Sequence, residues 1–255
     1  MSSITSPGNK AAKAIVNYMV FTAKHHSGFC MWDTKTTDFS IMNTPYGKDI
    51  VRSSVDECRK HDMKIGIFIH WGPYSAIGYR KGGRGYAEHV PKLIYEDPAH
   101  YYPYMKERWG ATPPEFGYKD IISEFKAENW DPDQWAELFA EVGARYVVMT
   151  AEHHDGWANW DSDLTPWNAV DMGPKRDLVG DLGRALRDRG LKYAPSYHRE
   201  RHTGFFATEK YVVHSEPRPD IAEEIEREPE AAMLYGPEFS YSKAFVDNYV
   251  ARWKE

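Results

Sequence analysis

Short apolar runs rich in aliphatic and aromatic residues recur along the chain, each bounded by polar or glycine-containing segments. Runs of this length and composition predict β-strands, here at residues 15–21, 64–69, 144–150 and 191–197. The interval before the last run has a helical pattern that ends at Gly190 and is carried by Leu178, Leu182, Ala185 and Leu186. Strands separated by helices favour βαβ units on a parallel sheet, which places the chain in the α/β class.

The segment 18–70 recurs without a gap as segment 146–198. Each copy contains a paired histidine, His25–His26 in the first and His153–His154 in the second, followed by a glycine and then by Trp-Asp. An internal repeat of this kind indicates one supersecondary unit that is used twice. We therefore expect both copies to form a strand, a loop and a helix with superposable backbones.

The pattern predicts a partial (β/α)8 barrel of the TIM type with about four βα units. We assign residues 1–63 to the duplicated unit and 64–255 to the N-terminal half of the barrel, together in one structural domain. Residues 75–126, rich in Gly, Pro, Tyr and charge, are expected to form a long loop with short helices above the barrel mouth. A helix should begin at Pro132 with Asp131 as its N-cap, and a last amphipathic helix should span about residues 242–253.

Open sheet edges are costly, so a sheet of four strands also predicts self-association, and a homo-oligomer that completes an eight-stranded assembly is the simplest closure.

Composition narrows the function further. The net charge of −6 and the lack of a basic stripe argue against a nucleic-acid partner. The chain has neither an apolar stretch long enough to span a membrane nor a signal peptide at residues 1–10, so a cytoplasmic location is expected for this form.

The aromatic content of 15% favours a carbohydrate ligand, although a Trp-rich core explains it equally well. Cys30 and Cys58 form no CxxC pattern and are expected to be free thiols or core residues.

The histidine pairs do not have the spacing of metal ligands. Adjacent residues of a strand point to opposite faces, and neither pair has HxH or HxxxH spacing, so no metal or other cofactor is expected. One core histidine and one loop histidine would be the simplest alternative. Glu152 and Asp155 flank the second pair, however, and His70 ends the neighbouring strand at the equivalent height. Imidazoles in this arrangement suit the recognition of sugar hydroxyls.

Several longer sequence motifs resemble those of a known family. They are Lys64-Ile-Gly-Ile-Phe-Ile-His-Trp-Gly-Pro-Tyr-Ser75, Tyr86-Ala-Glu-His-Val-Pro91, Tyr95-Glu-Asp-Pro98, Phe125-Lys-Ala-Glu-Asn-Trp-Asp131 and Val147-Val-Met-Thr-Ala-Glu-His-His-Asp-Gly-Trp157. Over residues 64 to about 205 they resemble, in family order, the N-terminal barrel half of the α-L-fucosidases of glycoside hydrolase family 29. Residues 15–64 resemble the second strand and helix of the same family.

The resemblance implies a retaining glycoside hydrolase that acts on terminal L-fucose of glycans. Carried over residue by residue, it implies substrate contacts at His70, at Glu88 of a lid loop, at His153 and His154, and at Tyr197. This chain has His89-Val90 where the family usually has Trp-Tyr. The family's fourth strand, which carries the nucleophilic aspartate in a Trp-x-Asp phrase, has no counterpart before Glu255, so no catalytic carboxylate is assigned.

Retaining hydrolysis requires two carboxyl groups, and the carboxylates near the predicted mouth favour other roles. Asp155 precedes Gly156 and suits a turn, Asp161 suits a cap or turn, and Glu200 lies among basic residues. We therefore expect a fucosidase-like protein of weak activity. The alternatives are a non-catalytic half-barrel that binds fucose and a recombined gene product that folds only by association.

Overall fold

The computed structural model describes residues 18–19, 29–35, 37–77, 87–202, 204–206, 218–236 and 243–255. His25 and His26 of the first pair, and most of the run 15–21, lie outside these residues. In the part of the chain that is described, no helix is long and apolar enough to cross a membrane. Cys30 and Cys58 are both buried free thiols, as expected from the sequence.

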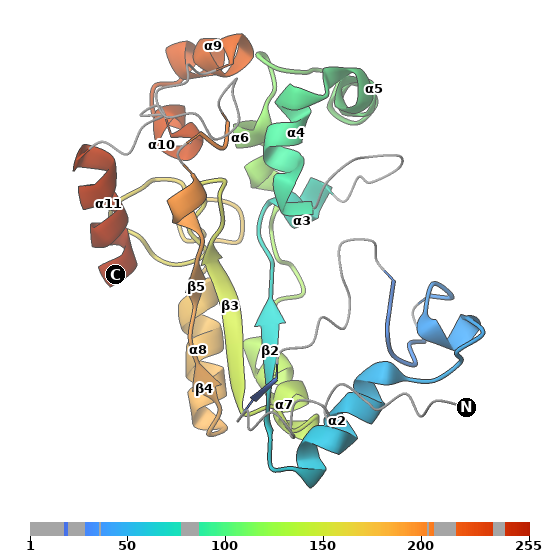
Figure 1. Ribbon diagram of the computed structural model, residues 1–255. Helices are drawn as coiled ribbons and strands as arrows, with labels where there is room; N and C mark the ends of the chain where they lie inside the picture. The colour runs from blue at the N-terminus through green and yellow to red at the C-terminus, as the bar shows by residue number, and fades with distance from the viewer. Residues whose placement is uncertain are drawn as a thin grey trace.

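The centre of the molecule is a parallel sheet (Figure 1). Its strands are β1 (Tyr18–Met19), β2 (Lys64–Ile69), β3 (Tyr146–Glu152), β4 (Lys192–Tyr193) and β5 (Ser196–Tyr197). The order is β1-β2-β3-β4, and β5 also pairs with β3. The predicted fourth strand is thus split into two short pieces around Ala194 and Pro195, because proline has no backbone N–H to donate to the ladder. The predicted α/β class and parallel pairing are confirmed.

The described parts of the two repeat copies have the same local structure. Helix α2 (Ile50–Lys60) begins after its N-cap Asp49, and helix α8 (Leu178–Asp188) begins after its N-cap Asp177, at equivalent positions of the repeat. The strand registers match as well, since Tyr18 pairs with Lys64 and Tyr146 pairs with Lys192. In the described residues, the helix and the strand pairing of the two copies therefore occupy equivalent positions.

The two faces of the sheet differ in how they are covered. Val147 and Met149 of β3 are fully buried in one apolar core with residues of α8 such as Leu182. Helix α7 (Pro132–Glu141) packs beside α8 on this side and begins, as predicted, at an Asp131 N-cap. Side chains of a strand alternate between faces, so Phe68 of β2, which is 46% exposed, lies on the less covered face.

The segment expected to form a long loop with short helices, residues 75–126, is largely helical where it is described. Its helices lie above the carboxyl ends of the strands in Figure 1. They are α3 (Tyr74–Ile77), which begins one residue before the segment, η2 (Ala87–His89), α4 (Val90–Glu96), α5 (Pro98–Trp109), α6 (Tyr118–Ile121) and η3 (Ile122–Glu124). The expected short helices are thus present, and they pack on the core because tyrosines such as Tyr101 and Tyr118 are almost completely buried.

The last part of the chain folds back over the carboxyl ends of the strands (Figure 1). It forms η4 (Arg199–Arg201), α9 (Pro219–Arg227), α10 (Ala231–Tyr235) and α11 (Lys243–Lys254), while the short η1 (Ile41–Asn43) lies in the first repeat copy. Helix α11 agrees with the predicted C-terminal helix to within one residue at each end.

Candidate functional site

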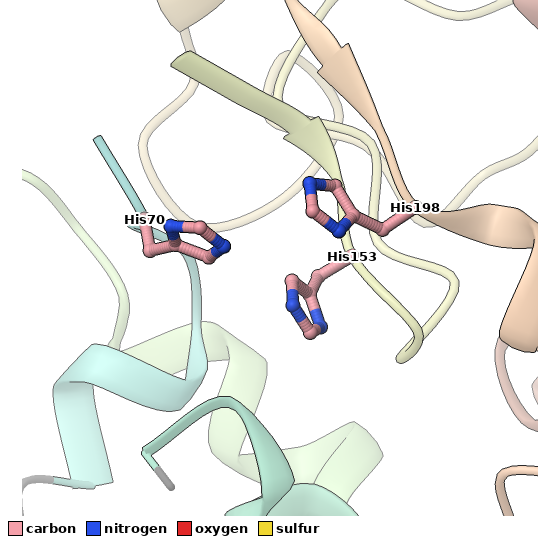
Figure 2. A group of neighbouring side chains, drawn as sticks. All are labelled: His70, His153 and His198. Carbon is pink, nitrogen blue, oxygen red and sulfur yellow. The ribbon is translucent and has the colours of Figure 1, made fainter. Parts of the chain in front are cut away.

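Three histidines from neighbouring strands meet at the carboxyl-terminal edge of the sheet (Figure 2). His70 follows β2, His153 follows β3 and His198 follows β5. One ring nitrogen of each lies within 4.8 Å of those of the other two. We call these three residues the histidine cluster. It forms because parallel strands end at one edge, so residues that follow them share one height.

The adjacent histidines of the second pair have different partners. The ring of His153 stacks on that of His198 with centroids 4.9 Å apart. His154 donates from Nδ1 to the carbonyl oxygen of His198 at 2.9 Å, and its ring lies 5.4 Å from that of Phe205. The pair lies just beyond the end of β3, so both imidazoles stay at the same edge of the sheet although only His153 joins the cluster.

Burial controls the protonation of these imidazoles. His153 is only 5% exposed, and burial together with the neighbouring imidazoles, His154 first, holds its pKa far below the usual value. Burial also lowers the pKa of His154 and that of His198. His153, His154 and His198 are therefore neutral at pH 7, each with one donor and one acceptor nitrogen.

The predicted lid glutamate lies close to this site. Glu88 is buried in η2, and the next residue, His89, has its ring 6.4 Å from that of His154. Tyr74 links the two regions: its ring is 5.8 Å from that of His153. Burial raises the pKa of Tyr74, and the charges of Asp155 and Glu88 raise it further.

Tyr197 has a different environment from the other predicted contacts. Consecutive strand residues face opposite ways, and Ser196, which precedes it, is hydrogen-bonded to His198. The ring of Tyr197 lies 5.1 Å from that of Tyr249 of α11, and its hydroxyl donates to the backbone carbonyl of Tyr249 at 3.5 Å. Tyr197 thus contacts the C-terminal helix.

Asp155 is a buried carboxylate with structural partners. Its Oδ2 accepts a hydrogen bond of 2.5 Å from the hydroxyl of Tyr118, and its Oδ1 accepts a long one of 3.4 Å from the backbone N–H of Trp157. Burial raises its pKa to about 7 against the opposing effect of the Tyr118 bond. The contact to Trp157 is the turn role that the sequence favoured.

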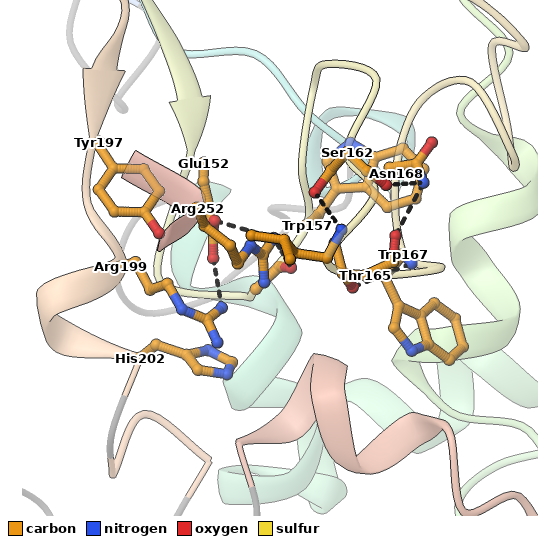
Figure 3. A network of polar contacts seen from close by, with 12 residues as sticks. Glu152, Trp157, Ser162, Thr165, Trp167, Asn168, Tyr197, Arg199, His202 and Arg252 are labelled. Carbon is orange, nitrogen blue, oxygen red and sulfur yellow. Dashed lines mark hydrogen bonds and ion pairs between the residues drawn. The ribbon is translucent and has the colours of Figure 1, made fainter. Parts of the chain in front are cut away.

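Glu152 lies between two arginines (Figure 3). Its Oε1 is 2.7 Å from Nη1 of Arg199, and its Oε2 is 3.0 Å from Nη2 of Arg252 on α11. The side chains of Glu152 and Arg252 are fully buried. The sequence indicated Glu152 only as a flank of the histidine pair, and it gave no local signal for a partner a hundred residues away.

His198 is the functional candidate that the sequence interpretation missed. A signal for it existed: His70 and His198 are the last matched residues of the two repeat copies. The repeat unit therefore ends in a histidine twice, at the same edge of the sheet, and His153 lies between these two positions.

Comparisons with known proteins agree on one family. A family model described as alpha-L-fucosidase matches residues 9–66 and, separately, residues 61–250. The tissue alpha-L-fucosidase of Bos taurus is 36% identical over 177 residues, which are 65% of this chain and 36% of that protein. That of Rattus norvegicus is 42% identical over 133 residues, 52% of this chain and 27% of that protein.

A solved structure of Thermotoga maritima alpha-fucosidase in complex with fucose resembles this fold with a TM-score of 0.51. It is 31% identical, and the match covers 74% of this chain and 48% of that one. The chain thus spans about a third of the bovine relative and about half of the bacterial one. The two separate matches of the family model fit a region that is partly duplicated.

Proposed function

Because this chain belongs to the α-L-fucosidase family, we propose that it binds terminal L-fucose of glycans at the carboxyl-terminal edge of its sheet. One observation carries the proposal. His70 and the pair His153–His154, which follow two adjacent parallel strands, lie together in a partly open site. The rings of His153 and His154 are neutral, and all three rings offer hydrogen-bonding groups in fixed planes, which suits sugar hydroxyls. Glu88 lies beside them on η2 and is proposed to close over the sugar.

The fold supports the proposal that this site lies at the end of a (β/α)8 barrel. We propose that the parallel strands and the helices α2, α7 and α8 form part of a (β/α)8 barrel, whose ligands bind at the carboxyl ends of the strands. The less covered face that carries Phe68 would then be the barrel interior. The relatives of this chain are fucosidases, and they are longer than the segment that matches.

Catalysis by residues 1–255 alone is proposed to be weak. A retaining glycosidase needs two carboxyl groups about 5 to 5.5 Å apart, one as nucleophile and one as acid and base. Near the histidines, Asp155 is hydrogen-bonded to a buried tyrosine and Glu152 is held between two arginines. Neither is placed to attack a sugar. A non-catalytic fucose-binding protein is the alternative function.

Titration calorimetry with L-fucose tests the binding. The double variant His153→Ala, His154→Ala should lose fucose binding, because it removes the hydrogen-bonding rings. The matched control is His25→Ala, His26→Ala in the first copy, which should bind like the unmodified chain. Loss of binding in the control with retention in the second-copy variant would contradict the assignment.

Release of nitrophenol from an aryl α-L-fucoside tests the catalysis. The purified chain should turn over far more slowly than about 1 s⁻¹, the lower end of ordinary enzyme rates. A rate at or above that value would mean that a carboxylate described above as structural is the nucleophile. The variants Asp155→Asn and Glu152→Gln, each checked for folding by circular dichroism, would then identify it.

A further inference from the structure

The histidine cluster combines three imidazoles from three separate strand ends. His70, His153 and His198 approach one another with ring centroids 4.9 to 5.6 Å apart. Figure 2 shows the rings around a common gap, with a nitrogen of His70 directed across it. Sugar recognition accounts for His70 and the His153–His154 pair, but it leaves His198 without a role.

Three histidines and one open position form the ligand set of some catalytic zinc sites. Imidazole is a borderline ligand that suits Zn²⁺, Cu²⁺ and Ni²⁺ better than Mg²⁺ or Ca²⁺. His70 is solvent-exposed and His153 is buried, so water can reach the cluster from the His70 side. The adjacent pair His153–His154 lacks ligand spacing, as the sequence indicated, but here the third ligand comes from another strand.

A buried polar atom without a partner marks the same place. Nδ1 of His153 is buried and has no hydrogen-bond partner, although the residue is only 5% exposed. A buried nitrogen of this kind costs free energy unless something binds it. A metal ion bound by the cluster would engage this nitrogen or, through a ring flip, the other nitrogen of the same ring.

The orientation of His198 is set by a hydrogen-bond chain. Nε2 of His198 is hydrogen-bonded to Oγ of Ser196 at 3.0 Å, and the hydroxyl of Ser196 donates to Oγ1 of Thr150 at 3.4 Å, which favours the tautomer with the proton on Nε2 of His198. This arrangement leaves the lone pair of His198 on Nδ1. A metal-bound histidine characteristically donates its other ring N–H in this way, which fixes its tautomer and ring plane.

We propose that His70, His153 and His198 form a binding site for a divalent late first-row transition metal, with Zn²⁺ as its best occupant. Tetrahedral ligands about 2.0 to 2.1 Å from zinc place their nitrogens about 3.4 Å apart. The ring nitrogens here lie within 4.8 Å, so side-chain rotation that includes the exposed His70 completes the site. The proposal does not depend on fucose binding, but the two sites share His70 and His153, so zinc and sugar should exclude each other.

Calorimetric titration of the full chain with Zn²⁺ in a non-coordinating buffer tests the site. The unmodified chain should bind one Zn²⁺, and His198→Gln and His153→Gln should each weaken binding by at least about 10-fold. Mutating a residue that only hydrogen-bonds a metal ligand already reduces metal affinity by about this factor, so the loss of a ligand itself should cost no less. The matched control is His61→Gln, at the C-cap of α2 and before β2, where the histidine contacts Glu57 and is at the opposite end of β2 from His70. It should bind as the unmodified chain does.

Cobalt(II) keeps the test decisive if a variant fails to fold. The unmodified chain with Co²⁺ should show the intense visible absorption of a four-coordinate ion, and added Zn²⁺ should displace it. A weak six-coordinate spectrum, the absence of Zn²⁺ binding, or binding that survives His198→Gln would each overturn the proposal. Fucose binding is measured separately, and its loss would leave this result unchanged.

Discussion

Glu152 shows how a single residue depends on distant parts of the chain. Its carboxylate is fully buried between Arg199 and Arg252, which lie on η4 and α11. A buried charge is costly unless it is paired, so the carboxylate of Glu152 offsets the desolvation of both arginines although the two arginines repel each other. Arg252 also donates from Nη2 to the carbonyl oxygen of Gly156 at 3.3 Å, so α11 is joined both to β3 and to the loop after it.

Replacing Arg252 should therefore be strongly destabilising. Arg252→Met leaves Oε2 of Glu152 without its ion-pair partner and should lower the free energy of unfolding by about 3 kcal/mol, since Arg199 still pairs with Oε1. The triple variant Glu152→Gln, Arg199→Met, Arg252→Met removes all three buried charges and should recover part of this loss. Urea unfolding followed by circular dichroism measures both. If the triple variant is less stable than the single one, the cost does not come from the broken ion pair.

Glu224 makes stability depend on pH. It accepts hydrogen bonds from Tyr95 at 3.0 Å and from Tyr235 at 2.5 Å, but burial outweighs them and raises its pKa to about 7. The folded state therefore binds this proton more tightly than the unfolded chain does. The resulting stability is complete below the unfolded pKa of 4.5 and is lost as the pH rises towards 7.

The variant Glu224→Gln isolates this contribution, because glutamine resembles the protonated acid. Its free energy of unfolding should be similar to that of the unmodified chain near pH 4.5 and should exceed it at about pH 8. Taking the difference between the two proteins removes the effect of histidines that titrate over the same range. A difference that does not change with pH would show that Glu224 stays ionised in the folded state.

At the scale of elements, the repeat uses one capping device twice. Oδ1 of Asp49 accepts from the backbone N–H of Arg52 at 2.7 Å, and Oδ1 of Asp177 accepts from that of Gly180 at 2.7 Å. Both carboxylates satisfy N–H groups that have no partner inside their helix. The N-cap aspartate is present at the equivalent position of both copies, even though most other residues of the two helices differ.

The cap of α8 can be tested alone. Asp177→Ala should destabilise the protein by about 1 kcal/mol, since it leaves the N–H of Gly180 without its acceptor. Asp177→Asn keeps an acceptor oxygen and should cost much less. Chemical unfolding of the two variants gives the comparison. Equal losses would mean that the charge of Asp177, and not its hydrogen bond, stabilises the helix.

At the scale of the whole molecule, the sheet has one face that its own helices leave partly exposed. Phe68 on this face is 46% exposed, and Trp253 of α11 is 67% exposed. Natural proteins cover or pair open sheet edges and large apolar surfaces. We therefore expect self-association, with an assembly that completes a barrel-like sheet as the simplest arrangement.

Sedimentation velocity at micromolar concentration tests this expectation. The unmodified chain should sediment as a dimer or larger species, and Phe68→Asp should shift it towards the monomer, because a charge replaces an exposed apolar ring on the proposed contact face. Leu138→Asp on α7, also exposed but on the helical side, is the matched control. A folded, monodisperse monomer of the unmodified chain would contradict the prediction.

The sequence alone determined the features that depend on neighbouring residues. The helices that begin after Asp131 and Asp177 were predictable because capping and helical periodicity act within one or two turns. The parallel sheet followed from the spacing of apolar runs, and the placing of His70 and His153 at one edge followed from parallel strands. The family resemblance also rested on local features, namely short contiguous sequence motifs.

Tertiary structure alone decided the features that join distant segments. The sequence predicted short helices within residues 75–126, but it did not show that tyrosines such as Tyr118 are buried in the core, because composition does not reveal which aromatic residues pack inside. The pairing of Glu152 with Arg252 and the direction of Tyr197 towards α11 depend on how the C-terminal helix folds back. The approach of His198 to His70 and His153 likewise needed β5 to pair with β3, since side chains from separate strands meet only after the sheet has formed.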